Sequence, residues 1–227
     1  MIKEKEPRID GLVNNAGIMF APRAFTEDGI ESHWGVNHLG HILLTRLLTD
    51  LLEPGGRVLF MVNLEYRKAR DGIKFDDINL EKNYDKSYAY YQSQLANVLA
   101  TQALAEELAS KMITVNAIYP GIVRNTRIKR HMGIDKSKFM QYLSRPALWV
   151  VEVYPNEAAA TPLFMLVDRS VSGLTGKMYA NMAEMAIVDI GKDMTAARKL
   201  LAIDDYWAGT KTKEELLGAK NKKWKKI

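Results

Sequence analysis

The chain has 227 residues, 47% of them hydrophobic and 26% charged, which is enough for one substantial core and typical of a globular protein. It contains no cysteine and no long apolar run, which excludes disulfides, thiolate sites and a membrane span, so we expect a soluble cytoplasmic protein, with membrane association left open. The net charge of +5 comes from five lysines in the last eight residues; the remainder holds 27 basic and 27 acidic residues, which argues against nucleic-acid binding.

Short apolar runs alternate with longer helical patterns in the first half of the chain, as in βαβ units. Residues 11–14 are predicted to form a short strand that ends in the turn-forming sequence Asn14-Asn15-Ala16-Gly17. A helix is expected over 28–52, because apolar side chains recur there at spacings of three and four, and Pro54-Gly55-Gly56 stops it. Residues 57–62 then form the second strand.

The second half begins with a long helix predicted from Ser87 to Ser110. A stripe of small residues on it, Ala96, Ala100 and Ala103, permits close helix packing, either across a homo-oligomer interface or in the core. The remaining elements are expected to be a strand at 113–118, an irregular flap at 126–153, a helix at 156–167, a strand at 176–179, a helix at 193–207 and a basic tail at 208–227. We interpret the tail as a solvated terminus; the alternative is a contact with anionic lipid or nucleic acid.

Three clusters follow the predicted strands: the Asn14–Gly17 turn, Val62-Asn63, and the sequence that runs from Tyr119 through Pro120 and Gly121 to Val123. Ligands bind at the carboxyl ends of the strands in open α/β sheets, so we expect these clusters to share one site. One turn of the long helix places Tyr90 and Gln94 on the same face. The four histidines show no spacing that indicates a metal site, and we predict none.

Together these motifs resemble the short-chain dehydrogenase/reductase family, in its retinol-dehydrogenase-like branch. The resemblance covers about Ile9 to Trp207 and rests on Asn-Asn-Ala-Gly after a strand, Tyr90 at the start of a long helix, and Pro-Gly after the next strand. Further matching segments are residues 35–41, 75–79, 93–99 and 130–133. It implies an α/β fold, a Rossmann-type parallel sheet with helices on both faces, in one partial domain over 1–227 that is truncated on its N-terminal side.

The resemblance also implies the roles of site residues. Asn37 corresponds to the asparagine that holds a proton-relay water, and Tyr90 to the general acid/base. Asn14, Ala16 and Gly17 would support the adenosine side of an NAD(P) cofactor. Tyr90 and Gln94 would face its ribose, and Pro120, Gly121 and Val123 the nicotinamide. The implied substrate is a lipophilic alcohol or aldehyde.

Three departures from the family pattern bear on activity. The sequence contains no GxxxGxG turn, which in the family cradles the cofactor pyrophosphate, so binding of NAD(P) by this chain is doubtful. Gln94 stands where the family has a lysine, and a unit charge about 4 Å away is worth about 4 kcal/mol, or close to three pKa units on the tyrosine. If the strand register is kept, Asn63 stands at the position of the family's catalytic serine. If the following loop varies in length, Glu65 stands there instead. We favour Asn63.

Three functional interpretations follow. The first is a retinol-dehydrogenase-like oxidoreductase by lineage whose activity is weak or lost. The second is a non-catalytic pseudoenzyme that acts as a binding or dimerisation partner, and the third is a fragment of a longer dehydrogenase. The resemblance also implies that the first strand of the family sheet, which is missing here, lies beside the strand at 11–14. If the chain is complete as given, that strand is an exposed edge, and we expect either a cover from the N-terminal segment or self-association.

Overall fold

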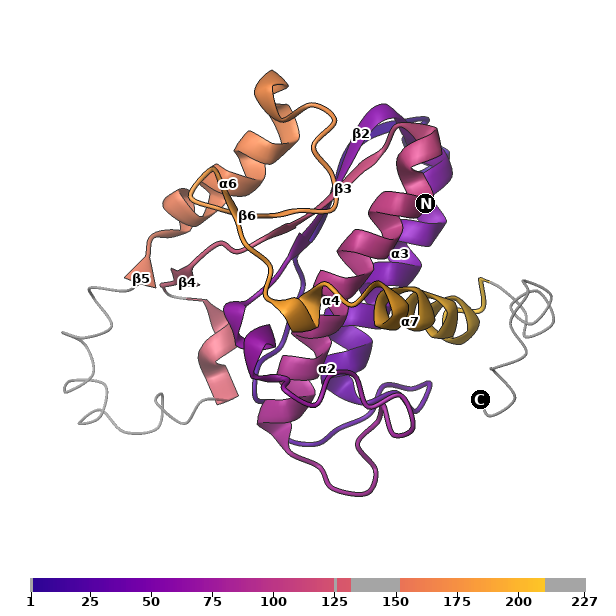
Figure 1. The fold of residues 1–227 in the computed structure, drawn as a ribbon, viewed down its shortest axis with the longest axis vertical. Helices are drawn as coiled ribbons and strands as arrows, with labels where there is room; N and C mark the ends of the chain where they lie inside the picture. The colour runs from indigo at the N-terminus through magenta and orange to yellow at the C-terminus, as the bar shows by residue number, and fades with distance from the viewer. Residues whose placement is uncertain (1, 125, 132–151, 211–227) are drawn as a thin grey trace.

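The computed structural model describes residues 2–124, 126–131 and 152–210 (Figure 1). Its main sheet has five strands in the order β1-β2-β3-β6-β7, and β4 and β5 form a separate pair. The strands are β1 (Ile9–Asn14), β2 (Leu52–Met61), β3 (Thr114–Ile118), β4 (Ile122–Val123), β5 (Glu152–Val153), β6 (Met178–Ala180) and β7 (Ala183–Met185). The helices are α1 (Ile2–Lys5), α2 (Ser32–Trp34), a π-helix (Gly35–Leu39), α3 (Gly40–Leu48), α4 (Lys86–Leu108), α6 (Pro155–Val167) and α7 (Met194–Trp207).

The register of the parallel strands brings their carboxyl ends to one edge of the sheet. Asn14 of β1 lies opposite Phe60 of β2, and Met61 of β2 lies opposite Ile118 of β3. The turns that follow these three strands therefore emerge side by side. In the main sheet, β1, β2, β3 and β6 are parallel, as predicted. The short β7, which the sequence did not indicate, runs antiparallel to β6.

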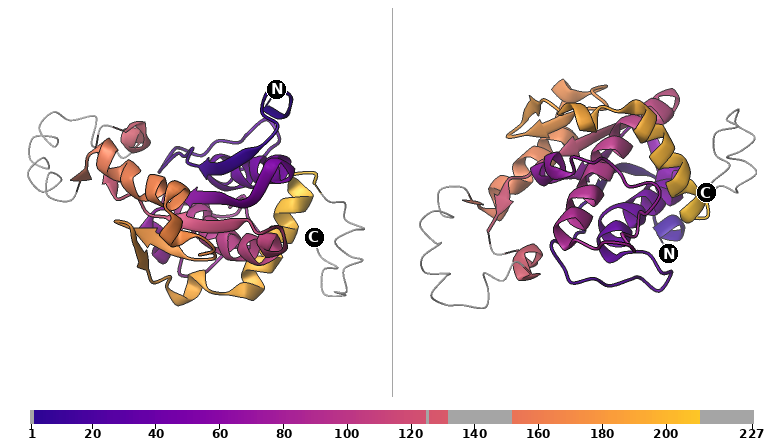
Figure 2. Two further views of the ribbon diagram at one scale, coloured as in Figure 1. Left: turned by 90° about the horizontal axis from the view of Figure 1, so that it is seen from above. Right: turned by 60° about the horizontal axis from the view of Figure 1, so that its bottom comes forward.

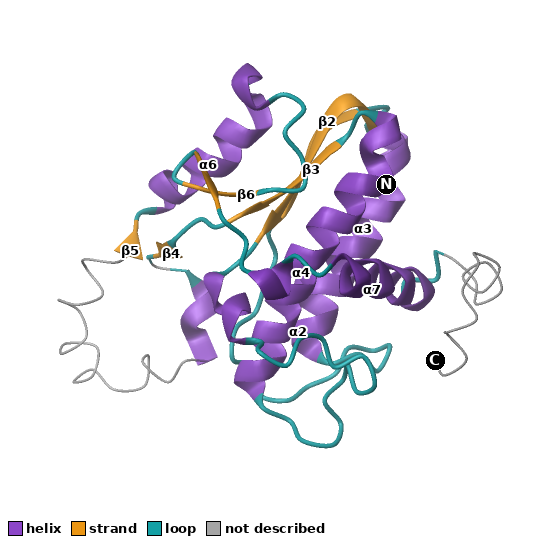
Figure 3. Ribbon diagram, viewed as in Figure 1, coloured by secondary structure: helices purple, strands orange, loops and turns teal. Residues whose placement is uncertain are grey.

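Helices cover both faces of the sheet, which confirms the predicted fold class. α3 and α4 lie on one face and α6 on the other, while α7 crosses α4 (Figures 2 and 3). Side chains of β2 alternate accordingly: Val58 and Phe60 enter the large core beneath α4, and Leu59 enters the smaller core beneath α6. Both cores are apolar layers that hold the strand ends in place.

The long helix α4 is buried along most of its length, in the centre of the protein. Ala96, Ala100 and Ala103 are all buried in the large core, and α7 packs against α4. The small residues therefore serve close packing within the chain, which was the core alternative, and a homo-oligomer through this helix stays a prediction. The predicted bounds of this helix, Ser87 to Ser110, agree with α4 and the 3₁₀ turn Ala109–Lys111 that continues it.

The helix expected over 28–52 is shorter at both ends. It begins at Ser32, because the Glu31 side chain accepts the backbone N–H of Trp34 as a cap, while Gly29 in the preceding turn has φ 76°. It ends in a 3₁₀ turn, Thr49–Leu51, and β2 starts directly at Leu52. Pro54-Gly55-Gly56 therefore belongs to the strand and does not separate helix from strand.

The N-terminal strand β1 has one partner, β2, among the described residues. Asp10, Gly11 and Val13 are exposed, so the described part of the N-terminal segment does not cover this edge. Most of the predicted flap, 132–151, and most of the tail, 211–227, lie outside the described residues. The start of the flap, Arg127–His131, is a 3₁₀ turn, and the pairing of β4 with β5 brings its two ends together.

Candidate active site

A cavity of about 360 Å³ opens at the carboxyl ends of β1, β2 and β3, where the three predicted clusters meet. It is lined by residues 15–19, Asn37, residues 61–63, Tyr90, Gln94, residues 120–123, residues 126–128 and Arg130. Nine of the ten residues expected at a catalytic or cofactor site therefore line one cavity: Ala16, Gly17, Asn37, Asn63, Tyr90, Gln94, Pro120, Gly121 and Val123.

The tenth, Asn14, lies behind the cavity wall. It is buried at the end of β1, and its Nδ2 donates a hydrogen bond of 3.0 Å to Oγ1 of Thr45 on α3. Because its side chain is turned toward α3, Asn14 anchors the turn and does not line the cavity. The lining side chains outside the predicted clusters are Ile18, Met19, Met61, Thr126, Arg127 and Ile128, together with Arg130 of the matching segment 130–133. Their position directly beside predicted motifs is the signal that could have found them.

Asn37 lies in the π-helix Gly35–Leu39 and holds the turn after β1 against α4. Its Oδ1 accepts the backbone N–H of Ile18 at 2.8 Å, and its Nδ2 donates to the Ile18 carbonyl oxygen at 3.0 Å. The same Nδ2 donates to Oγ of Ser93 at 2.9 Å. The wider π turn, a feature often found at functional sites, places this side chain at the cavity.

Tyr90 lies at the cavity wall in the first turns of α4 and is only 2% exposed. The ring of Phe20 packs edge-on against it, with centroids 5.2 Å apart. Burial, followed by the negative charge of Glu65, raises the pKa of the Tyr90 hydroxyl, and a hydrogen bond from the Asn63 side chain opposes this rise. None of the influences on this pKa comes from a cation, so the hydroxyl is a weaker acid than an ordinary tyrosine.

Gln94 and Asn63 are linked directly. Oε1 of Gln94 accepts the backbone N–H of Asn63 at 2.8 Å, and Oδ1 of Asn63 in turn accepts the backbone N–H of Glu65 at 3.0 Å. Both amide oxygens are therefore engaged. The remaining polar groups of the two side chains are their amide N–H groups, and that of Asn63 hydrogen-bonds the Tyr90 hydroxyl. Asn63 and not Glu65 lines the cavity beside Tyr90, as the strand register predicted.

The loop after β3 closes the opposite side of the cavity. Gly121 has φ 83°, and a Cβ at this position would lie 3.1 Å from Cγ2 of Val153, so a larger residue would be strained and crowded. Residues 120–123 line the cavity together with the turn that follows β1, Tyr90 and Gln94.

Within the described ranges, no helix combines the length and apolar character needed to cross a membrane. No group of three or more acidic or histidine side chains in those ranges is arranged to hold a metal ion.

The fold and the position of the cavity define a Rossmann-type α/β protein with its ligand site at the strand ends. Residues 1–181 match the family model described as enoyl-(acyl carrier protein) reductase. The chain is 38% identical over 212 residues to retinol dehydrogenase 14 of Mus musculus, covering 91% of this chain and 61% of that protein. It is also 38% identical over 204 residues to retinol dehydrogenase 13 of Homo sapiens, covering 88% of this chain and 61% of that protein.

Solved structures agree. An uncharacterised protein from Mycobacterium paratuberculosis superposes with a TM-score of 0.69 at 26% identity, covering 91% of this chain and 69% of that one. A blue fluorescent protein from a metagenomic library, in complex with NADPH, shows the same fold with a TM-score of 0.57 at 21% identity, covering 79% of this chain and 65% of that one. The chain belongs to the short-chain dehydrogenase/reductase family and is retinol-dehydrogenase-like. It spans about 60% of the length of the retinol dehydrogenases that it matches.

Proposed function

We propose that the cavity is the alcohol or carbonyl site of an NAD(P)-dependent oxidoreductase for lipophilic substrates, with turnover that is weak or lost. The observation that carries the proposal is the uncharged Gln94 beside the buried Tyr90 in a cavity formed by the strand ends. The retinol dehydrogenase relatives support the substrate class. The apolar side chains Ile18, Met19 and Met61 in the cavity wall fit a lipophilic molecule.

The residues present fit the nicotinamide half of a cofactor. The backbone of residues 15–17 and that of residues 120–123 both line the cavity, and Tyr90 and Gln94 between them offer hydroxyl and amide groups to a ribose. A nicotinamide held there would supply or accept the hydride. The described residues and the printed sequence contain no glycine-rich turn for the pyrophosphate, so the fit is limited to this half.

The chain's own residues would hold and polarise the substrate oxygen. The Asn63 amide donates a hydrogen bond. The Tyr90 hydroxyl gives its proton to the oxygen in reduction, and its ionised form takes a proton from the substrate hydroxyl in oxidation. A tyrosine of ordinary pKa, about 10, is only about 0.1% ionised at pH 7, and the raised pKa of Tyr90 lowers that fraction further. Slow proton transfer at Tyr90 is therefore the expected defect.

A second candidate is a binding protein without turnover. The observation that favours it is the hydrogen bond between Gln94 Oε1 and the Asn63 N–H, which makes a neutral clamp next to Tyr90. Such a site would bind a carbonyl or hydroxyl group without transferring a proton. Both candidates bind the same class of ligand. For the first, the missing lysine charge at position 94 and serine hydroxyl at position 63 are sufficient to explain a lack of activity; for the second, they are not.

A restoration experiment separates them. NADPH and NADH are titrated by fluorescence, and turnover of retinaldehyde is measured for the natural chain and for the double variant Asn63→Ser/Gln94→Lys. We expect the double variant to gain at least about 100-fold in rate, because one well-placed donor is typically worth 10²–10³. The control adds Tyr90→Phe to the double variant, which should remove the gain.

Each outcome has a distinct meaning. Cofactor binding without any gain in the double variant would favour the binding protein. Micromolar cofactor binding together with rapid retinaldehyde turnover by the natural chain would overturn the proposed loss of activity. Failure of both proteins to bind either cofactor would overturn NAD(P) dependence for this chain.

A further inference from the structure

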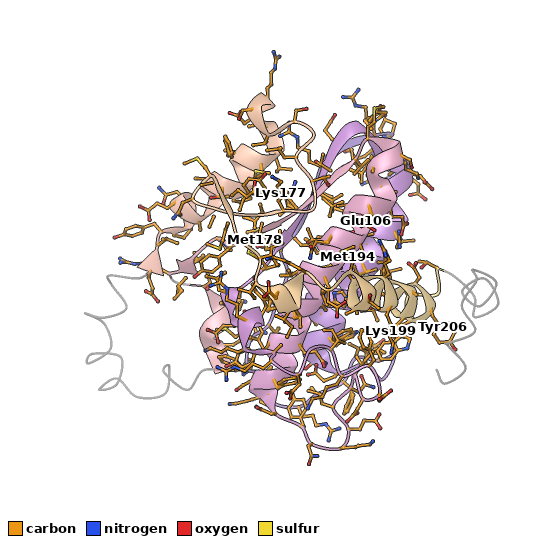
Figure 4. All side chains as sticks on the ribbon, in the orientation of Figure 1. Glu106, Lys177, Met178, Met194, Lys199 and Tyr206 are labelled. Carbon is orange, nitrogen blue, oxygen red and sulfur yellow. The ribbon has the colours of Figure 1, made fainter. Side chains whose placement is uncertain are left out.

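A histidine and an aspartate form a fully buried pair behind the cavity. His38 Nε2 lies 2.8 Å from Oδ2 of Asp204, and both side chains are 0% exposed. His38 belongs to the π-helix that carries Asn37, whereas Asp204 belongs to α7, which runs from Met194 to Trp207 across α4. Met194 near the start of α7 and Tyr206 near its end show the course of this helix in Figure 4. The pair therefore connects the C-terminal helix to the π-helix.

The hydrogen bonds around His38 fix the number of protons on the pair. Nδ2 of Asn97 donates to the Asn37 carbonyl oxygen at 2.8 Å, so Oδ1 of Asn97 is the atom that faces Nδ1 of His38, at 2.9 Å. An amide oxygen only accepts, so Nδ1 must carry a hydrogen. At Nε2, either the imidazole is also protonated or Asp204 is a carboxylic acid. In both cases the pair holds one proton more than a neutral histidine and an ionised aspartate.

The surroundings favour retention of this proton. Burial, first of all, raises the pKa of Asp204, and the neighbouring Asp205 adds to the rise, while His38 and Arg46 oppose it. Arg46 is itself paired with Asp205 and Glu107, and the nearby His41 is kept neutral by burial, which lowers its pKa to about 4. The ring of Trp34 covers His38 edge-on at 4.8 Å. Oδ1 of Asp204 has no hydrogen-bond partner among the described residues, which disfavours a bare carboxylate there.

A continuous set of hydrogen bonds leads from this pair to the cavity. His38 hydrogen-bonds the side chain of Asn97, and Asn97 donates to the backbone carbonyl of Asn37. The Asn37 side chain in turn hydrogen-bonds the backbone N–H and carbonyl of Ile18. Ile18 lines the cavity. The orientation of the cavity wall thus depends on groups that do not themselves touch the cavity.

We infer that His38 and Asp204 are positioning residues, whose shared buried proton fixes the Asn37 turn and the Ile18 wall of the cavity. When the pair loses this proton as the pH rises, two acceptors face each other and repel. The hydrogen bond between His38 and Asn97 is then lost, and the hydrogen bonds that position Ile18 weaken. Burial raises the pKa of Asp204, so the folded chain binds a proton there more tightly than the unfolded chain does, and the contribution to stability is present at low pH and lost as the pH rises. This inference goes beyond the proposed function and does not require turnover.

Nuclear magnetic resonance of the natural chain with ¹⁵N-labelled histidine tests the proton count directly. We expect Nδ1 of His38 to carry a proton at neutral pH. When the pair loses its proton as the pH rises, we expect the nitrogen signals of His38 and the backbone amide of Ile18 to change with one common midpoint. An unprotonated Nδ1 at neutral pH, or an Ile18 amide that does not change with His38, would overturn the inference. These measurements stand without any variant and without cofactor.

The variant Asp204→Asn keeps a donor for Nε2 of His38 but cannot release a proton in this range. It is expected to hold Ile18 in the neutral-pH position at all pH values, with no common transition. The matched control, Asp205→Asn, removes the adjacent carboxylate; the transition should remain and move to lower pH, because Asp205 raises the pKa of Asp204. A transition that persists unchanged in Asp204→Asn would contradict the shared proton.

Discussion

Oε1 of Gln94 accepts the backbone N–H of Asn63 across the gap between α4 and the end of β2, at 2.8 Å. This bond joins the two positions at which the chain departs from the catalytic residues of its family. It sets the amide of Gln94 beside Tyr90 as an uncharged group. The consequences for the tyrosine can be measured directly.

Introducing a charge at this position should lower the pKa of Tyr90. In Gln94→Lys a unit charge about 4 Å from the hydroxyl, at an effective dielectric near 20, gives a fall of about three pKa units. Tyrosinate absorbance, followed against pH and corrected with a Tyr90→Phe variant, measures the change. The uncharged variant Gln94→Met should leave the pKa raised; an equal fall in that variant would contradict an electrostatic cause.

Asn37 should stabilise the turn after β1. Asn37→Ala removes the partners of both Ile18 backbone groups and of Ser93, and an unsatisfied buried group costs about 1–3 kcal/mol. We expect a loss of stability of that size in urea unfolding, together with weaker ligand binding in the cavity. Asn83→Ala, at an exposed position, is the control and should change stability by less than about 0.5 kcal/mol.

Arg46 should be worth far more than a surface arginine. It bonds to Asp205 on α7 and to Glu107 on α4, and its side chain is only 11% exposed. Arg46→Met removes the cationic partner of the buried Asp205, for which we expect a loss of about 3 kcal/mol in urea unfolding. Arg198→Met breaks the exposed ion pair with Glu106 and should cost less than about 1 kcal/mol. Similar losses in the two variants would show that burial does not decide the effect.

His41 should make the protein sensitive to acid. Its pKa is lowered to about 4 by burial and by His38, from an ordinary value of 6.5. A base with a depressed pKa is protonated more readily in the unfolded chain, so its contribution is present above about pH 6.5 and falls by up to about 3 kcal/mol as the pH drops to 4. His41→Phe removes this term, and its stability should depend less on pH between 6.5 and 4. If the fall in stability between about pH 6.5 and 4 is unchanged in this variant, His41 is excluded as its cause.

The open edge of β1 should promote self-association of the 227-residue chain. Val13 is 36% exposed on this strand, and unpaired edge groups are templates for another strand. Sedimentation velocity over a range of concentrations should show association that weakens in Val13→Lys. Leu163→Lys, which charges an exposed position of α6, is the matched control and should have no effect. A natural chain that stays monomeric throughout would contradict the prediction.

Local patterns predicted most of the elements, because periodicity and turn residues act over a few positions. The helices at 156–167 and 193–207 agree with α6 and α7 to within one residue. The start of the helical segment at Ser32, in α2, was missed because the cap is a side chain, Glu31, whose function depends on the fold around it. β7 was missed because three residues carry too little pattern.

Residue identity and spacing were sufficient to predict the family, the alternation of the main strands and helices, and the exchanges at Gln94 and Asn63. Which side chains face the cavity depends on the packed fold: Asn14 turns to Thr45 on α3, whereas Asn37 reaches Ile18. It also decided that His38 meets Asp204, 166 residues away. Contacts of this kind depend on how distant segments pack, and burial then sets their protonation. A pattern of neighbouring residues encodes neither these contacts nor the protonation of the groups that make them.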